Sequence, residues 1–173
     1  ISLATTVAGI TLQKVLLNSS NPFATTVDDL QSLADSPATG AFATRTACPN
    51  FVHDDAKHQW REFSEGNTIN CLGYSCHTFD YYIDAIKKVQ SSSTANMKLA
   101  VFSISGYASE IADMLKQLAA AFIPVDNSTS PQLLVEINLS CPNIPGKPPI
   151  AYDFEGMKDY LTTVFHEGNH GLN

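Results

Sequence analysis

Basic residues are scarce in this sequence. The chain has 10 Lys and Arg against 17 Asp and Glu, for a formal net charge of -7, and only Lys87 and Lys88 are adjacent. A protein that follows nucleic-acid phosphates needs a stripe of positive charge. The sequence therefore argues against a nucleic-acid partner.

Long apolar runs are also missing. No stretch approaches the roughly 20 apolar residues of a membrane-spanning helix, and the N-terminus lacks the basic flank and apolar core of a signal peptide. With 44% hydrophobic and 16% charged residues among 173, the composition is typical of one compact domain with a core. We expect a single soluble, cytoplasmic domain over residues 1–173, without a membrane partner.

Cysteine pairs at metal-binding spacing are absent. Cys71, Cys76 and His77 lie close together, but no C-x-x-C or H-x-x-x-H unit accompanies them, so a zinc site is not expected. The two further cysteines are Cys48 and Cys141. A chain of this length without a secretory signal is not a disulfide scaffold. We expect neither a metal site nor structural disulfides.

The apolar pattern alternates between short strands and helices. Residues 2–13 predict a small β-hairpin, and strands are expected at 14–17, 40–44, 98–104 and 133–138. Helices follow each strand, starting near Thr26, Phe79, Gly106 and Asp153. Repeated strand–helix order predicts a parallel sheet with right-handed crossovers. A complete (β/α)8 barrel takes about 250 residues. The expected fold class is therefore α/β, a TIM (β/α)8 barrel type with about the N-terminal half present, preceded by the hairpin.

Residues 47–65 show no clear periodicity and predict a long connection. His53 and His58 within it have no carboxylate pattern that would make them ligands. We expect both histidines on the solvated surface.

Polar residues gather where the predicted strands end. The groups are Ser19, Ser20 and Asn21; Thr44, Arg45 and Thr46; Asn70 to Tyr74; and Asn138 to Asn143. In parallel barrels the carboxyl ends of the strands meet on one face. Several amides, one cation and one thiol suit a planar, hydrogen-bonding, anionic ligand. Phosphoryl transfer is not indicated, because neither a G-x-x-x-x-G-K-[ST] loop nor a carboxylate pair for magnesium is found.

Cys141 stands one step into the loop that follows the apolar run 133–137, within NLSCPNIPGKP. A thiol can act as a general base once its surroundings tune its pKa. The alternative is that Cys141 is a small buried apolar residue, and that the prolines and glycine of the loop only shape a turn.

The segment NLSCPNIPGKPPIAYDFEGM at 138–157 resembles the active-site loop of class 1A dihydroorotate dehydrogenases, the soluble flavin enzymes of pyrimidine (UMP) biosynthesis. The resemblance extends back through FSISGYASEIADMLKQL, TINCLGYSCHTFDYYIDAI and LLNSS. These motifs occur in the order and near the spacing of that family, so the resemblance covers nearly the whole chain.

The resemblance implies an enzyme that oxidises dihydroorotate to orotate with FMN. Cys141 would take the C5 proton as general base while hydride leaves C6 for the flavin. The implied cofactor-binding residues are Ser19, Ser20, Asn21, Arg45, Thr46 and Asn138. The implied substrate-binding residues are Arg45, Asn70, Cys71, Leu72, Gly73, Tyr74, Asn138 and Asn143. Family members dimerise and pass electrons to fumarate, so a homodimer and a fumarate acceptor are also implied.

Some positions differ from the family pattern. Arg45 stands where the family has Lys, Asn21 where it has Gly, and Tyr74, Ser75 and Cys76 where it has Leu, Pro and Asn. The family's phosphate-binding glycines belong to the half of the barrel that this chain does not span. Two alternatives stay open: a related FMN enzyme acting on another dihydropyrimidine, and an inactive truncated fragment.

Overall fold

A three-stranded parallel sheet forms the centre of the molecule. The computed structural model describes residues 3–50, 52–56, 60–92, 98–122, 133–141 and 148–167. The sheet has the order β3-β6-β7, with β3 at Ala41–Ala43, β6 at Leu99–Ile104 and β7 at Leu133–Ile137. Ala41 pairs with Leu99, and Ile104 pairs with Ile137. The fold is therefore α/β with a parallel sheet, as the sequence predicted.

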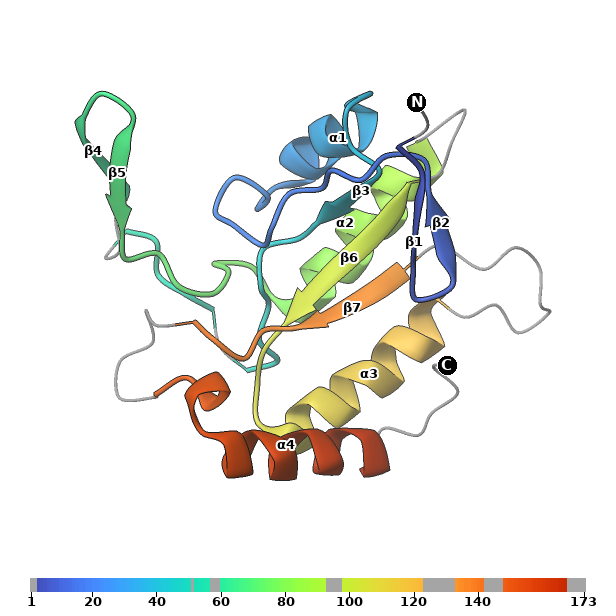
Figure 1. Ribbon diagram of the computed structural model, residues 1–173, viewed down its shortest axis with the longest axis vertical. Coiled ribbons are helices and arrows are strands. Elements are labelled where there is room, and N and C mark those ends of the chain that lie inside the picture. The colour runs from blue at the N-terminus through green and yellow to red at the C-terminus, as the bar shows by residue number, and fades with distance from the viewer. Residues whose placement is uncertain are drawn as a thin grey trace.

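Helices follow the strands of the sheet. They are α1 (Val27–Asp35), α2 (Phe79–Ser92), α3 (Ala108–Phe122) and α4 (Phe154–Glu167), the last preceded by the short 3-10 helix η1 (Ile150–Tyr152). Figure 1 shows them arranged around the sheet, with α3 and α4 side by side near the C-terminus. The helix starts predicted from the sequence agree with these bounds to within two residues.

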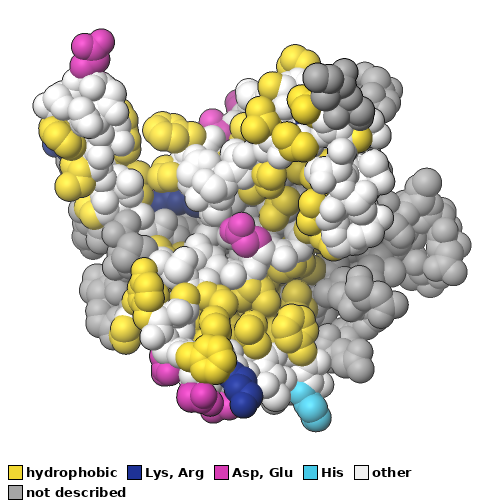
Figure 2. Space-filling model, in the orientation of Figure 1, with side chains coloured by type: hydrophobic (Ala, Val, Ile, Leu, Met, Phe, Trp, Pro, Cys, Tyr) yellow, Lys and Arg dark blue, Asp and Glu magenta, His cyan; other side chains and the backbone are white. Residues whose placement is uncertain are grey.

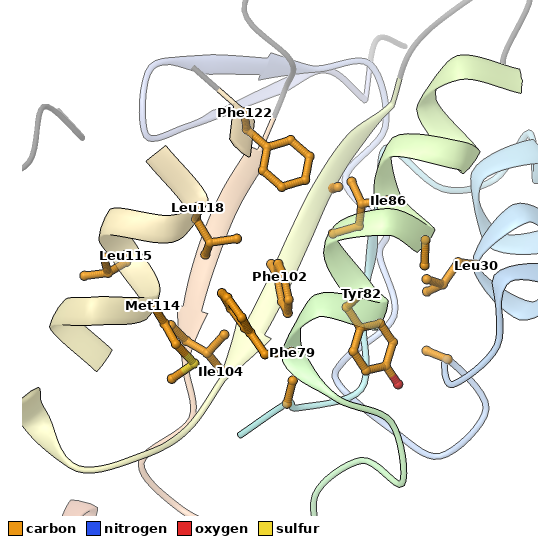
Figure 3. Close-up of a cluster of buried hydrophobic side chains, with 14 of the residues drawn as sticks. Leu30, Phe79, Tyr82, Ile86, Phe102, Ile104, Met114, Leu115, Leu118 and Phe122 are labelled. Carbon is orange, nitrogen blue, oxygen red and sulfur yellow. The ribbon is translucent and has the colours of Figure 1, made fainter. Parts of the chain in front are cut away.

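The two faces of the sheet differ because side chains alternate along each strand. Phe102 of β6 points into the core between α2 and α3, where it stacks on Phe79 at 5.2 Å and lies near Met114 and Leu118 (Figure 3). On the opposite face, a smaller apolar cluster joins the strands to a hairpin; its members are Leu12, Ala41, Ala43, Leu99 and Val101. One face is thus packed by helices and the other is closed in part by the hairpin.

That hairpin consists of β1 (Thr5–Val7) and β2 (Ile10–Leu12), which pair antiparallel. Its turn places Ala8 and Gly9 at positive φ, 47° and 78°. It lies within residues 2–13, where a hairpin was expected, and beside the amino ends of β6 and β7 (Figure 1). The carboxyl ends of the strands are therefore left open for a site.

The strand predicted at residues 14–17 is not formed. Only Leu16 makes a bridge, with Thr39. Val15, Leu16 and Leu17 are 46%, 61% and 47% exposed, so this apolar run is not covered by the described residues. The chain nevertheless passes very close to the start of β3. A Cβ on Gly40 would therefore collide with the backbone carbonyl of Lys14. Glycine at 40 permits this approach.

The predicted long connection at 47–65 contains part of a second hairpin. β4 (Trp60–Ser64) and β5 (Asn67–Asn70) pair antiparallel with an irregularity between Glu62 and Ser64. The hairpin projects away from the body of the molecule (Figure 1). All nine of its strand residues are exposed. Its charged and aromatic residues lack a regular alternation, which is why the sequence pattern missed it.

The N-terminus of α1 carries a complete capping box. The Thr26 side chain accepts a hydrogen bond from the Asp29 N–H at 3.2 Å, and the Asp29 carboxylate accepts one from the Thr26 N–H at 2.8 Å. Burial raises the pKa of Asp29, but the hydrogen bonds from Thr26 and Thr25 outweigh it and hold the pKa below its usual value. The cap fixes where the chain leaves the strand-end segment 18–25.

Replacing this cap tests its contribution. Thr26→Ala should lower the free energy of unfolding by about 1 kcal/mol, because the Asp29 N–H loses its acceptor. Urea denaturation measures the change. Thr162→Ala, at an exposed position within α4, is the matched control and should stay within about 0.5 kcal/mol of the parent. Equal losses in both variants would contradict a capping role.

Candidate active site

A cavity of about 330 Å³ lies at the carboxyl ends of the strands. It collects residues from all four predicted strand-end groups. Those among the predicted site residues are Ser20, Asn21, Arg45, Thr46, Asn70, Leu72, Gly73, Tyr74, Asn138 and Cys141. The convergence expected from a parallel α/β fold is therefore present.

Two of the described predicted residues, Ser19 and Cys71, do not line this cavity. Ser19 is exposed, and its carbonyl accepts hydrogen bonds from the side chains of Asn18 and Asn21. Cys71 is also exposed. Asn143 lies outside the described residues, as do Pro142 and Gly146 of the same loop.

Thr46 is the centre of a hydrogen-bond network at the floor of the cavity. Its Oγ1 lies 2.8 Å from Ser20 Oγ, 2.9 Å from Ser103 Oγ and 2.9 Å from Asn138 Nδ2. Ser103 Oγ in turn donates to Glu136 Oε1 at 2.6 Å. The network joins the ends of β3, β6 and β7 to the segment that carries Ser20.

Glu136 fixes the direction of these hydrogen bonds. A carboxylate only accepts hydrogen bonds, so the Ser103 hydroxyl donates its one hydrogen to Glu136. The Ser103 oxygen must then accept a hydrogen bond from the Thr46 hydroxyl. Thr46 has then used its own hydrogen and must accept from Ser20. The Ser20 oxygen therefore keeps only acceptor capacity for a ligand in the cavity. A ring N–H is the partner that such an oxygen would take.

Ser103 and Glu136 were missed by the sequence reasoning. The signal that could have found Glu136 is a charged residue inside the apolar run 133–137. Alternation places Glu136 on the face opposite Val135 and Ile137, so it points away from the helices. It pairs in register with Ser103 on β6.

Arg45 is buried and engaged with a residue that the sequence did not single out. Its side chain is 2% exposed, and its two terminal nitrogens bind the two carboxylate oxygens of Asp55 at 2.7 and 2.8 Å. The hydrogen bond from Arg45, strengthened by its charge, lowers the pKa of Asp55. Burial lowers the pKa of Arg45, but the hydrogen bond and charge of Asp55 outweigh it and raise the pKa. Both groups are ionised at neutral pH.

The backbone holds Asp55 beside Arg45. The His53 N–H donates to the Ser75 carbonyl at 2.7 Å, and the Ser75 N–H donates to the Thr46 carbonyl at 2.7 Å. These two hydrogen bonds fix the connection that follows residue 47 to Thr46, the residue next to Arg45. His53 lies within this connection and is buried, with 4% of its surface exposed. The expectation that His53 lies on the solvated surface is wrong, while His58 lies outside the described residues.

Cys141 lies between two cavities. It lines the 330 Å³ cavity and a second, smaller one of about 160 Å³ that also involves Tyr74 and Tyr160. Tyr160 donates to the Gly106 carbonyl at 3.0 Å, and burial raises its pKa to about 12. The Tyr74 hydroxyl lies 2.9 Å from Ser105 Oγ, and burial raises its pKa. Cys141 is half-buried, so its thiol is accessible from the cavity rather than sealed in the core.

The surface around the site is mostly uncharged. Figure 2 shows apolar side chains gathered between β7 and α4, with few basic groups on this face. Among the described residues no three His, Cys, Asp or Glu side chains are grouped to hold a metal ion. The described helices include none long and apolar enough to cross a membrane.

Comparison with known proteins identifies similar sequences. The family model for dihydroorotate dehydrogenase matches residues 2–170. A Streptococcus agalactiae protein described as dihydroorotate dehydrogenase A (fumarate) is 33% identical over 165 residues, which cover 95% of this chain and 50% of the relative. An Enterococcus faecalis protein with the same description is 34% identical over 158 residues, covering 91% of this chain and 47% of that protein.

A solved structure shares the fold. Ligand-free dihydroorotate dehydrogenase from Eimeria tenella superposes with a TM-score of 0.68 at 14% sequence identity, covering 95% of this chain and 45% of that chain. At this identity the likeness concerns the fold alone. The chain spans about half the length of the curated relatives it matches.

The network predicts a stability effect at Ser103. Ser103→Ala should lower the free energy of unfolding by about 1–3 kcal/mol, because Thr46 and Glu136 each lose a partner in a poorly hydrated place. Chemical denaturation measures this loss. Ser109→Ala, at an exposed position on α3, should change stability by less than about 0.5 kcal/mol. A Ser103→Ala variant as stable as Ser109→Ala would show that the network contributes little.

Proposed function

The chain belongs to the dihydroorotate dehydrogenase family, and on that premise we propose that it is the N-terminal half of an FMN-binding (β/α)8 barrel that oxidises dihydroorotate to orotate in pyrimidine biosynthesis. On this proposal residues 1–173 are one partial domain preceded by the β1–β2 hairpin. The observation that carries the proposal is the convergence of Ser20, Thr46, Asn138 and Cys141 on one cavity at the strand ends.

The donors and acceptors of the cavity fit the ring system of a flavin. A flavin ring edge offers carbonyl acceptors and one ring N–H. Asn138 has a second amide hydrogen beyond the one given to Thr46, and the Ser20 oxygen accepts. We assign cofactor contacts to Ser20, Asn21, Arg45, Thr46 and Asn138, with Ser19 beside them. FMN, when bound, supplies the acceptor for the hydride.

The residues of this chain would orient the substrate and remove a proton. Asn70 Oδ1 accepts from the Leu72 N–H at 3.2 Å, so its amide hydrogens remain for the pyrimidine. The Gly73 carbonyl accepts from Arg45, and we assign the Gly73 N–H to the ligand carboxylate. Cys141 takes the C5 proton. Asn138 and Asn143 hold the ring, while Leu72, Tyr74 and Cys71 border it.

The remaining features of the proposal come from the relatives. Their description as fumarate-type enzymes supports fumarate as the electron acceptor. A homodimer and a cytoplasmic location complete the proposal. A second candidate is a related FMN enzyme acting on an uncharged dihydropyrimidine, which the neutralisation of Arg45 by Asp55 favours.

Flavin binding is the first test. The purified protein, mixed with FMN and desalted, should keep flavin absorbance near one equivalent if the cavity completes a usable site. A protein that elutes colourless would show that this chain alone does not hold the cofactor. That result would favour the inactive-fragment alternative.

Cys141→Ser tests the general base. In the FMN-loaded protein, dihydroorotate oxidation should fall by at least about 100-fold near pH 7, because a serine hydroxyl is a much weaker base. Orotate affinity should stay within about twofold, since the side chain keeps its shape. Cys48→Ala, at a buried cysteine outside both cavities, serves as the control and should retain the parent rate. Normal turnover in Cys141→Ser would remove Cys141 from the catalytic role.

A further inference from the structure

We infer that Asp55 determines the charge preference of the cavity, by neutralising Arg45 so that an anionic ligand gains little over an uncharged one. The inference rests on the proposed function, since it concerns pyrimidines bound in the same cavity. Among the described residues that line the cavity, Arg45 carries the one formal charge. What pairs with it therefore decides the charge that a ligand meets.

The hydrogen-bonding capacity of Arg45 is almost fully used within the protein. Its two terminal nitrogens bind Asp55, and their other hydrogens point to Thr25 Oγ1 at 3.5 Å and to the Gly73 carbonyl at 3.3 Å. Nε is buried and has no hydrogen-bond partner among the described residues. The terminal N–H groups are therefore engaged within the protein, and the guanidinium cannot bind a ligand carboxylate through two parallel hydrogen bonds.

Asp55 is held where it is and stays ionised. The backbone bonds from His53 to Ser75 and from Ser75 to Thr46 fix the connection next to Arg45. The Cys76 thiol adds a hydrogen bond to the Asp55 carboxylate. Side-chain exposure is 2% for Arg45 and 35% for Asp55, so the pair reaches solvent through Asp55 rather than through Arg45. The Arg45–Asp55 ion pair is therefore a fixed structural part of the site.

A paired charge acts on a ligand as a dipole, whose field falls off faster than that of a free cation. The Coulomb attraction between Arg45 and a ligand carboxylate is opposed by repulsion from the Asp55 carboxylate, which lies 2.7 and 2.8 Å from the two terminal nitrogens of Arg45. A carboxylate must then rely on backbone N–H groups such as that of Gly73. The site should accept dihydropyrimidine rings with or without a carboxylate, selecting on ring hydrogen bonding instead of charge.

Asp55→Asn in the FMN-loaded protein tests this inference. The change keeps the shape of the side chain and leaves the Arg45 charge unopposed. Calorimetry at low salt should show orotate binding strengthened by about tenfold, while uracil, the same ring without the carboxylate, changes by less than about twofold. Asp54→Asn removes the same charge one residue away at an exposed side chain. It should leave both affinities within about twofold.

Three results would overturn the inference. Orotate and uracil could change equally in Asp55→Asn, Asp54→Asn could reproduce the orotate gain, or orotate affinity could fail to rise. Each would leave the proposed function standing, as long as the parent protein binds orotate. A parent that binds neither pyrimidine in the presence of FMN would instead overturn the proposed function, and the inference with it.

A measurement on the parent protein covers the case in which Asp55→Asn does not fold. Orotate affinity should change by less than about threefold between roughly 50 and 500 mM salt, because a neutralised site has little net field to screen. Steep weakening with salt would indicate an unopposed cation and overturn the inference.

Discussion

Thr46 ties together every segment that lines the candidate site. Its hydroxyl contacts Ser20, Ser103 and Asn138, and its carbonyl accepts the Ser75 N–H. A short polar residue suits this position, because Thr46 stands three residues after the end of β3 and is 3% exposed. If Thr46 moved, the four segments around it would lose the hydrogen bonds that hold them in position relative to one another. The geometry of the cavity thus depends on one side chain that is bonded on all sides.

Two acidic side chains set the polarity of the site without lining it. Glu136 orients the hydroxyl groups, so that Ser20 faces the cavity as an acceptor. Asp55 takes up the charge and most of the hydrogen bonds of Arg45. Asp55 acts directly on Arg45, which lines the cavity, and Glu136 acts through Ser103 on Thr46, which also lines it. The family resemblance drew attention to the lining residues, and the residues behind them determine what those can donate or accept.

The sequence predicted the parts of the structure that depend on local pattern. The four helix starts were predicted to within two residues, because helical periodicity is a signal that lies within a few residues. The convergence of strand-end residues followed from parallel topology. Asp55, by contrast, meets Arg45 only because the irregular connection folds back through Ser75, and no periodicity records that path. The run at 14–17 is strand-like in composition, but a strand also needs neighbours to pair with.

Among the residues that the structure describes, the parallel sheet has an unpaired edge at β7. Within the described residues β7 pairs with β6 on one side and with no strand on the other, and its apolar residues are only half-buried. Beyond β3, the exposed run Val15 to Leu17 forms a second apolar border. Edges of this kind accept strands from other chains. A strand that paired with β7 and a surface that covered Val15 to Leu17 would remove both borders.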